Sequence, residues 1–271
     1  PSTFDSDRFA WDSTEVAGTQ NGSSQWHTNE VELQRDSHTG NMYGELCAYQ
    51  AHTSIRQYIR TTPGVLYKVR LKHASLNSTY LDKMQVMIGT PGHEQPVEMT
   101  RTSVNGHGDK LNEKSTTIAT RVTNGNNRHH ADQWETYEGT YLIPDGQTTT
   151  RFTFKSIDSK QLDYGNVLDG IVFDKAYRLD YDKNASDATG EVPSNQRGRE
   201  NTTQPAKTKT NGKIRLTSDD TSGLPDHLVN GDFSVNYKDQ WLTGGWNWTS
   251  ITPDGKYLNS VRNWNDSATI W

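Results

Sequence analysis

The sequence has little cysteine, few apolar residues and no long hydrophobic run. A single cysteine, Cys47, among 271 residues excludes an internal disulfide and a zinc site built from cysteines. No stretch approaches the roughly 18 consecutive apolar residues that a membrane-spanning helix needs. The formal net charge is −5, with both signs scattered along the chain, which argues against a nucleic-acid binder with a basic face.

Aromatic residues are plentiful despite this polarity. Hydrophobic residues make up 31% of the chain, below the usual ~45–50%, and the mean hydropathy is −0.92. Yet the chain holds 8 Trp, 12 Tyr and 6 Phe, whereas disordered chains lack aromatic residues. Because large rings fill a narrow core with few residues, we expect a folded protein with a thin core and a polar surface.

Alternating apolar and polar residues predict strands, and no window holds an apolar 3.6-residue repeat long enough for a helix. The expected strands are Glu30–Gln34, Met42–Ala48, Ser54–Arg60, Val65–His73, Met84–Gly89, Thr136–Ile143, Thr148–Phe154 and Asn166–Phe173. Turn residues at Thr61–Gly64 and at Pro144–Gly146 predict two hairpins, each formed by the strand before the turn and the strand after it. Residues 90–133 are expected to form long loops or a short insertion. The pattern predicts an all-β chain, a jelly-roll β-sandwich.

Composition divides the chain into three parts. Residues 1–181 hold the predicted strands and form the expected jelly-roll body. Residues 182–223 offer almost nothing to bury, which predicts a flexible linker or loop. Residues 224–271 hold five of the eight tryptophans, and they are too aromatic for disorder and too short for a robust domain. We therefore expect the last segment to pack on something.

The motif Leu228–Phe233 with Gly244–Trp246 resembles the first strand of galactose-binding-like jelly rolls, which include carbohydrate-binding modules and repeat domains of bacterial surface proteins. Residues 26–173 resemble the rest of such a domain. In the family this strand opens the domain, whereas here it comes last. Either residues 224–271 complete the body, by circular permutation or by exchange between neighbouring molecules, or they begin the next repeat of an array. An exposed Trp-rich fragment is costly, which favours completion.

The resemblance implies a structural calcium ion near the first and last strands of the domain. The matching acids are Asp232 and either Asp169 or Asp174, and Ca²⁺ takes six to eight oxygen ligands. Related domains often carry a Glu two residues after the position of Asp232, where this chain has Ser234. A solvated turn acid is the alternative role for these residues.

Exposed aromatic rings beside amide side chains are typical of glycan-binding surfaces. The candidates are Trp246, Asn247, Trp248, Trp264, Trp134 and Tyr137. Core packing is the alternative for each single tryptophan. The chain shows no Ser-His-Asp order, zinc-protease helix motif or phosphate loop, so we expect no enzyme activity.

Together these features predict a non-catalytic adhesion or glycan-binding module, secreted or on the surface of a Gram-positive bacterium. Its partner would be a glycan or a host surface ligand, without nucleic acid and without membrane insertion. One alternative is a structural repeat or fibre subunit that self-associates by strand exchange. A secreted glycan-active enzyme is the third function.

Overall fold

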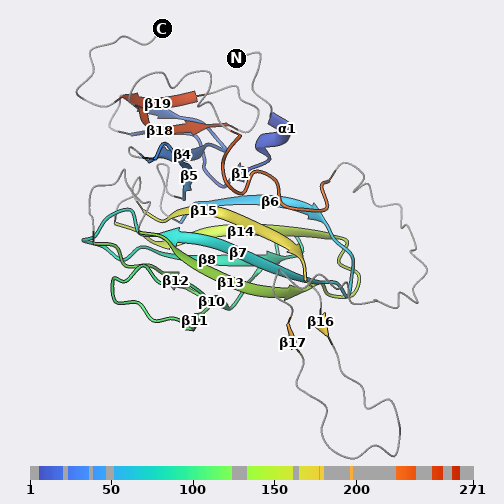
Figure 1. Cartoon of the computed structure of the whole chain (residues 1–271). Coiled ribbons are helices and arrows are strands. Elements are labelled where there is room, and N and C mark those ends of the chain that lie inside the picture. The colour runs from blue at the N-terminus through green and yellow to red at the C-terminus, as the bar shows by residue number, and fades with distance from the viewer. Residues whose placement is uncertain are drawn as a thin grey trace, which may run out of the picture.

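A computed structural model describes residues 6–20, 24–36, 39–46, 52–123, 133–160, 165–176, 178–179, 196–197, 224–235, 246–252 and 258–262. Two antiparallel sheets face each other across one core (Figure 1). The fold is therefore an all-β sandwich of the jelly-roll type, as the sequence pattern predicted. No helix in the described part of the chain is long and apolar enough to cross a membrane.

The smaller sheet has six strands in the order β1-β6-β14-β8-β12, and β9 pairs with β8. Their bounds are β1 Asp12–Ser13, β6 Ser54–Arg60, β8 Lys83–Gly89, β9 Gln95–Pro96, β12 Ile118–Ala119 and β14 Thr149–Asp158. Strands β6 and β14 pair over seven residues without a bulge. They form the centre of this sheet.

The larger sheet has nine strands in the order β11-β10-β13-β7-β15-β5-β4-β18-β19. Their bounds are β4 Val31–Arg35, β5 Met42–Glu45, β7 Leu66–Ala74, β10 Met99–Arg101, β11 Lys114–Ser115, β13 Glu135–Leu142, β15 Val167–Lys175, β18 Trp246–Ile251 and β19 Leu258–Arg262. Outside the two sheets are α1 Ser6–Phe9 and the short pairs β2 Gly18–Gln20 with β3 Ser24–Trp26 and β16 Arg178–Leu179 with β17 Gln196–Arg197.

Both hairpins expected from the sequence are wrong, although the strands themselves are present. Strand β6 pairs with β14 and β7 pairs with β13, so each turn carries the chain from one sheet to the other. The reason is burial: Ile55 and Ile59 on β6 point into the same core as Val69 and Leu71 on β7. Consecutive strands therefore face each other across the core. Residues 90–133, expected as loops or an insertion, contain the short strands β9 to β12.

Large rings fill the core between the sheets. Phe173 of β15 stacks on Tyr67 at 4.4 Å between centroids and meets the edge of Phe152 at 3.7 Å. All three side chains are buried. This packing accounts for a folded chain with so few apolar residues, because each ring removes a large apolar area from water.

The segment 224–235 packs into this same core. Phe233 is fully buried and stacks on Trp11 at 5.7 Å. The Gly231 carbonyl accepts a hydrogen bond of 2.9 Å from the Ile171 amide of β15. At Gly44 a Cβ atom would lie 2.6 Å from the Phe233 ring, so the glycine makes room for that ring.

The strands that follow this segment extend the nine-stranded sheet. Strand β18 pairs with β4 from Ile251 opposite Val31 to Trp248 opposite Gln34, and β19 pairs with β18. Figure 1 shows both strands beside β4 and β5. The linker predicted at 182–223 lies outside the described residues apart from β17, and the predicted domain boundaries stay a prediction.

Candidate binding pocket

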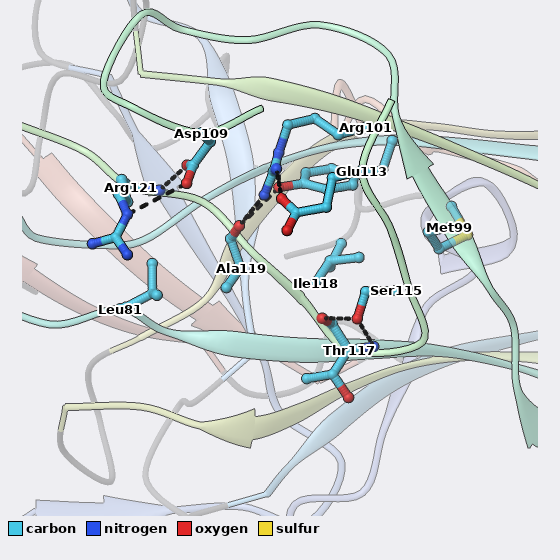
Figure 2. Close-up of a pocket in the computed structure, with 11 residues that line it drawn as sticks. Leu81, Met99, Arg101, Asp109, Glu113, Ser115, Thr117, Ile118, Ala119 and Arg121 are labelled. Atoms are coloured by element: carbon cyan, nitrogen blue, oxygen red, sulfur yellow. Dashed lines mark hydrogen bonds and ion pairs between the residues drawn. The ribbon is translucent and has the colours of Figure 1, made fainter. Parts of the chain in front are cut away.

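A pocket of about 200 Å³ lies at one open side of the sandwich, where the edge strand β12 of the smaller sheet approaches β10 and β11 of the larger sheet (Figure 2). Its lining residues combine an apolar floor with charged and hydroxyl side chains. They are Leu81, Met99, Arg101, Asp109, Glu113, Ser115, Thr117, Ile118, Ala119, Arg121 and Tyr137. Most of them belong to residues 99–121.

Arg101 holds the loops around the pocket together. Its side chain is 7% exposed and donates hydrogen bonds to the Lys110 carbonyl at 3.1 Å and the Ala119 carbonyl at 2.9 Å. It also pairs with Glu113, whose side chain is 57% exposed at the pocket mouth. Because its donors engage separate loop positions, the guanidinium fixes the shape of the pocket.

Behind the pocket lies a second, fully buried ion pair. The Arg101 Nε atom lies 2.6 Å from Glu135 Oε2, and Glu135 has no exposed side-chain area. The Tyr137 hydroxyl accepts a hydrogen bond of 3.0 Å from the same Nε atom. Burial raises the pKa of both Glu135 and Tyr137. Glu135 itself does not line the pocket.

A chain of hydrogen bonds anchors the pocket floor deep in the protein. The Tyr137 hydroxyl lies 2.8 Å from Thr120 Oγ1, which lies 2.9 Å from His73 Nδ1. His73 Nε2 is 2.9 Å from Asn166 Oδ1. Burial lowers the pKa of His73 to about 4, so the imidazole is neutral at pH 7. Satisfied buried networks of this kind rigidify the groups they connect.

The pocket mouth presents donors and acceptors to solvent. Asp109 accepts a hydrogen bond of 2.8 Å from the Arg121 amide, and its other carboxylate oxygen lies 3.4 Å from Arg121 Nε. The Arg121 side chain is 59% exposed. The Ser115 hydroxyl donates to the Thr117 carbonyl at 2.7 Å. The pocket can therefore offer both donors and acceptors to a polar ligand while Leu81 and Ile118 contact its apolar parts.

The glycan-binding residues expected from the sequence occupy several places. Tyr137 lines the pocket, but the residue is 2% exposed and its hydroxyl is already hydrogen-bonded to Arg101 and Thr120. Trp134 is half-buried and meets Tyr43 edge-on at 5.3 Å, away from the pocket lining. Trp246, Asn247 and Trp248 lie on β18, where only the backbone is described, and Trp264 lies outside the described residues.

Sequence reasoning missed the charged residues of the pocket. Arg101, Asp109, Glu113 and Arg121 all fall in residues 90–133, which were expected to be loops or an insertion. Spacing alone could not show that the guanidinium of Arg101 turns inward while Arg121 stays exposed. The one available signal was the mixture of both charge signs in a glycine-rich region.

Two of the three acids predicted to bind calcium, Asp169 and Asp174, lie on β15, and the third, Asp232, lies in segment 224–235. Asp169 is 6% exposed, and it accepts hydrogen bonds from Asn41 Nδ2 at 3.1 Å and from the Gly170 amide at 2.7 Å. Burial raises the pKa of Asp169, and the charge of Asp232 raises it further. Asp174 and Asp232 are exposed.

These acids alone do not supply the oxygens that calcium prefers. Asp169 lies opposite Lys72 and Asp174 lies opposite Lys68 in the pairing of β15 with β7, so each carboxylate has a cationic neighbour. Within the described ranges, no three side chains of His, Cys, Asp or Glu gather closely enough to hold a metal ion. Calcium binding therefore stays a prediction.

Comparisons with known proteins give distant likenesses. No family model and no curated protein matches the sequence. A solved structure described as "CBM4 structure and function" is 14% identical with a TM-score of 0.32, covering 64% of this chain and 99% of that one. The Clostridium thermocellum xylanase 10B CBM22-1–GH10 modules are 12% identical with a TM-score of 0.33, covering 65% and 28%.

A third likeness is the enzymatically active domain of the bacteriophage CBA120 tailspike protein 4, 9% identical with a TM-score of 0.31. The match covers 61% of this chain and 19% of that one, so less than a fifth of that domain's chain has a counterpart here. At these TM-scores the likenesses carry no argument about the ligand. The chemistry of the ligand is therefore inferred from the geometry of the pocket alone.

Proposed function

We propose that the chain is a glycan-binding module without catalytic activity, and that the pocket takes one sugar ring of its ligand. One observation carries the proposal: the pocket combines an apolar floor with the exposed Arg121 and its mostly buried partner carboxylate, Asp109. A sugar ring has apolar C–H faces and a rim of hydroxyl groups that each donate and accept hydrogen bonds. Arg121 supplies only donors and Asp109 only acceptors, so the pair can bind neighbouring hydroxyls.

The size of the pocket supports a small ligand portion. About 200 Å³ is below the roughly 300–1,000 Å³ typical of drug-sized ligands. The pocket is open to solvent at Glu113 and Arg121, whose side chains are 57% and 59% exposed. The rest of an oligosaccharide could therefore leave the pocket without a clash.

The carboxylates of the pocket support binding without turnover. Glycoside hydrolysis needs one carboxylic acid of raised pKa that can protonate the leaving oxygen. Here burial raises the pKa of Glu135, but Glu135 lies behind Arg101 and does not line the pocket. Glu113 and Asp109, which do line it, are each engaged by an arginine. This arrangement favours charge-assisted hydrogen bonding over general acid catalysis.

The proposal also includes where the protein acts and what it does there. We infer a secreted or cell-surface protein that adheres through a glycan or a host ligand, because the chain is rich in Ser, Thr, Asn and Gly and holds a single cysteine. A polar chain with a rigid, ligand-sized pocket suits recognition outside the cell.

Binding of the whole chain to an array of neutral oligosaccharides tests the proposal. We expect at least one to bind, and Arg121→Ala to weaken it about tenfold or more, since a hydrogen bond to a charged group contributes about 1.5–3 kcal/mol. Lys175→Ala, an exposed basic residue on β15, is the matched control. An unchanged affinity in Arg121→Ala, or release of new reducing ends from the bound sugar, would contradict the proposal.

A further inference from the structure

The outer face of the six-stranded sheet carries a second set of polar groups, and Arg56 and Thr153 at its centre do not line the pocket. Strand alternation turns the apolar residues of β6 and β14 into the core and the residues between them outward. The outward residues of the three central strands are Arg56, Tyr58 and Arg60 on β6, Arg151, Thr153 and Lys155 on β14, and Gln85 and Met87 on β8.

Two hydrogen-bonding atoms at the centre of this face have no partner among the residues that the structure describes. Thr153 lies directly opposite Arg56 on one side and Met87 on the other. Thr153 is 8% exposed. Both its Oγ1 atom and the Nε atom of Arg56 are buried without a hydrogen bond among the described residues. A buried donor left without a partner lowers stability, and such groups call for a specific explanation.

The charges on this face are mostly basic. Arg151 is paired with Glu94 and its guanidinium lies 5.6 Å from the centre of the Tyr58 ring. Arg56, Arg60 and Lys155 form no side-chain ion pair with any residue that the structure describes. The described acids on or beside the face are Glu94, Asp158 and Asp12. Asp158 pairs with Lys83 of β8, and Asp12 lies opposite Arg56 at the β1 edge while it accepts a hydrogen bond from Asn29. Basic side chains therefore outnumber acidic ones here, on a chain whose net charge is −5.

We propose that this face binds an anionic group, a carboxylate or a sulfate, of an acidic polysaccharide. Arg56 Nε and Thr153 Oγ1 are neighbouring donors that one anionic oxygen pair can satisfy together. Arg56 is half-buried with a flexible stem, so a rotation of its side chain can turn its Nε donor towards a ligand and open access to the neighbouring Thr153 hydroxyl. Lys155 and Arg60 lie further along the same strands, where the next anionic groups of a polymer would follow, and Tyr58 offers a ring face to a sugar.

An acidic peptide fits the face less well. Apart from Met87 and Tyr58, the outward residues of the central strands offer little apolar surface for the side chains of a peptide. The proposal does not depend on the pocket, because neither Arg56 nor Thr153 lines it.

Titration of the whole chain with three oligosaccharides tests the site: a galacturonic acid oligomer, a sulfated galactan oligomer and a neutral galactan oligomer of equal length. We expect an acidic oligomer to bind and its affinity to fall with added salt. The two acidic arms separate carboxylate from sulfate as the anion. Thr153→Val should weaken the acidic ligand about tenfold, since it removes one donor to a charged group. It should also raise the melting temperature, because the unpartnered hydroxyl is gone.

The controls separate this site from the pocket and from structural effects. Lys72→Ala removes a basic residue from the outer face of the other sheet and should leave the affinity for the acidic ligand unchanged. Arg121→Ala in the pocket should do the same. A Thr153→Val variant with a raised melting temperature but unchanged affinity would overturn the proposal. Equal binding of the neutral oligomer, or equally tight binding of a glutamate peptide or single-stranded DNA, would overturn it too.

Discussion

Glu45 on β5 shows how a single buried side chain sets the pH response of the fold. It lies directly opposite Glu32 on β4, and both are at most 5% exposed. Gln34 Nε2 donates to Glu32 at 3.1 Å and to Glu45 at 2.6 Å, and the Gly165 amide donates to Glu45 at 2.8 Å. Burial raises the pKa of Glu45 from 4.5 to about 8, and the charge of Asp82 adds to the rise.

This raised pKa predicts a loss of stability as the pH increases. Between pH 4.5 and 8 the folded protein keeps a proton on Glu45 that the unfolded chain releases, so the free energy of unfolding falls with rising pH. His73, with a folded pKa near 4, opposes this slope near pH 6.5, where the unfolded imidazole still binds about half a proton, and this opposing contribution fades towards pH 8. Asp82, with a pKa near 6, acts in the same direction as Glu45 and fades over the same range. One proton corresponds to a slope of about 1.4 kcal/mol per pH unit.

Urea unfolding at several pH values between 6.5 and 8 checks this prediction. The free energy of unfolding should fall across the window in the native chain, and Glu45→Gln should flatten the slope because the amide cannot lose a proton. Glu138→Gln, a half-exposed position on β13, is the control and should keep the slope. A native chain whose stability is level from pH 6.5 to 8 would contradict the raised pKa.

The predicted calcium site can also be tested at single residues. A ligand that binds only the folded state raises its stability by mass action. If Asp169 and Asp232 hold an ion, millimolar calcium should raise the melting temperature by several degrees, and Asp232→Asn should abolish that rise. Asp145→Asn, in the turn between β13 and β14, is a matched control. No shift with calcium or with a chelator would contradict the site.

At the scale of the elements, the sequence predicted where strands lie better than how they pair. The alternation at Ser54–Arg60 matches β6 residue for residue. The turn after it, Thr61–Gly64, predicts a chain reversal but contains no information on whether the reversal stays within a sheet or crosses the core. Pairing depends on which strand from elsewhere in the sequence forms hydrogen bonds along each strand, as β14 does along β6. The pocket was unpredictable for the same reason, since residues 99–121 form it by closing the gap between two sheet edges.

One side chain joins two elements that are far apart in the sequence. Gln57 of β6 is 2% exposed and points into the core. Its Nε2 atom donates to the Val229 carbonyl at 2.5 Å, and its Oε1 atom accepts from the Val229 amide at 3.1 Å. The side-chain amide of Gln57 therefore pairs with the Val229 backbone in segment 224–235 as the backbone of a neighbouring strand would.

Gln57→Ala should lower the free energy of unfolding by about 1–3 kcal/mol, because it leaves the buried polar groups of Val229 without partners. Chemical denaturation at fixed pH measures the change. Gln95→Ala, at an exposed position on β9, is the control and should have little effect. An unchanged stability in Gln57→Ala would show that segment 224–235 contributes little to the fold.

For the whole molecule, the position of the C-terminal segment decides between one self-contained sandwich and an array of exchanged strands. The motif Leu228–Phe233 comes last in this sequence, whereas it comes first in the galactose-binding-like jelly rolls that it resembles. In the structure the Gly231 carbonyl accepts its hydrogen bond from Ile171 of the same chain. The same contacts could be made by the segment of a second molecule, because strand edges accept strands from either source.

Deletion of residues 224–271 is therefore the most informative change to the whole molecule. It removes Phe233 from the core, exposes the apolar surface of Trp11 and leaves the β4 edge without β18. We expect the remaining body to unfold or aggregate, and the excised segment added in trans to restore a soluble, cooperatively melting protein. Light scattering and thermal melts measure both outcomes. A deletion variant that stays monomeric with an unchanged melting temperature would show that the segment belongs to a separate repeat, and a restored protein that forms higher oligomers would favour strand exchange between neighbours.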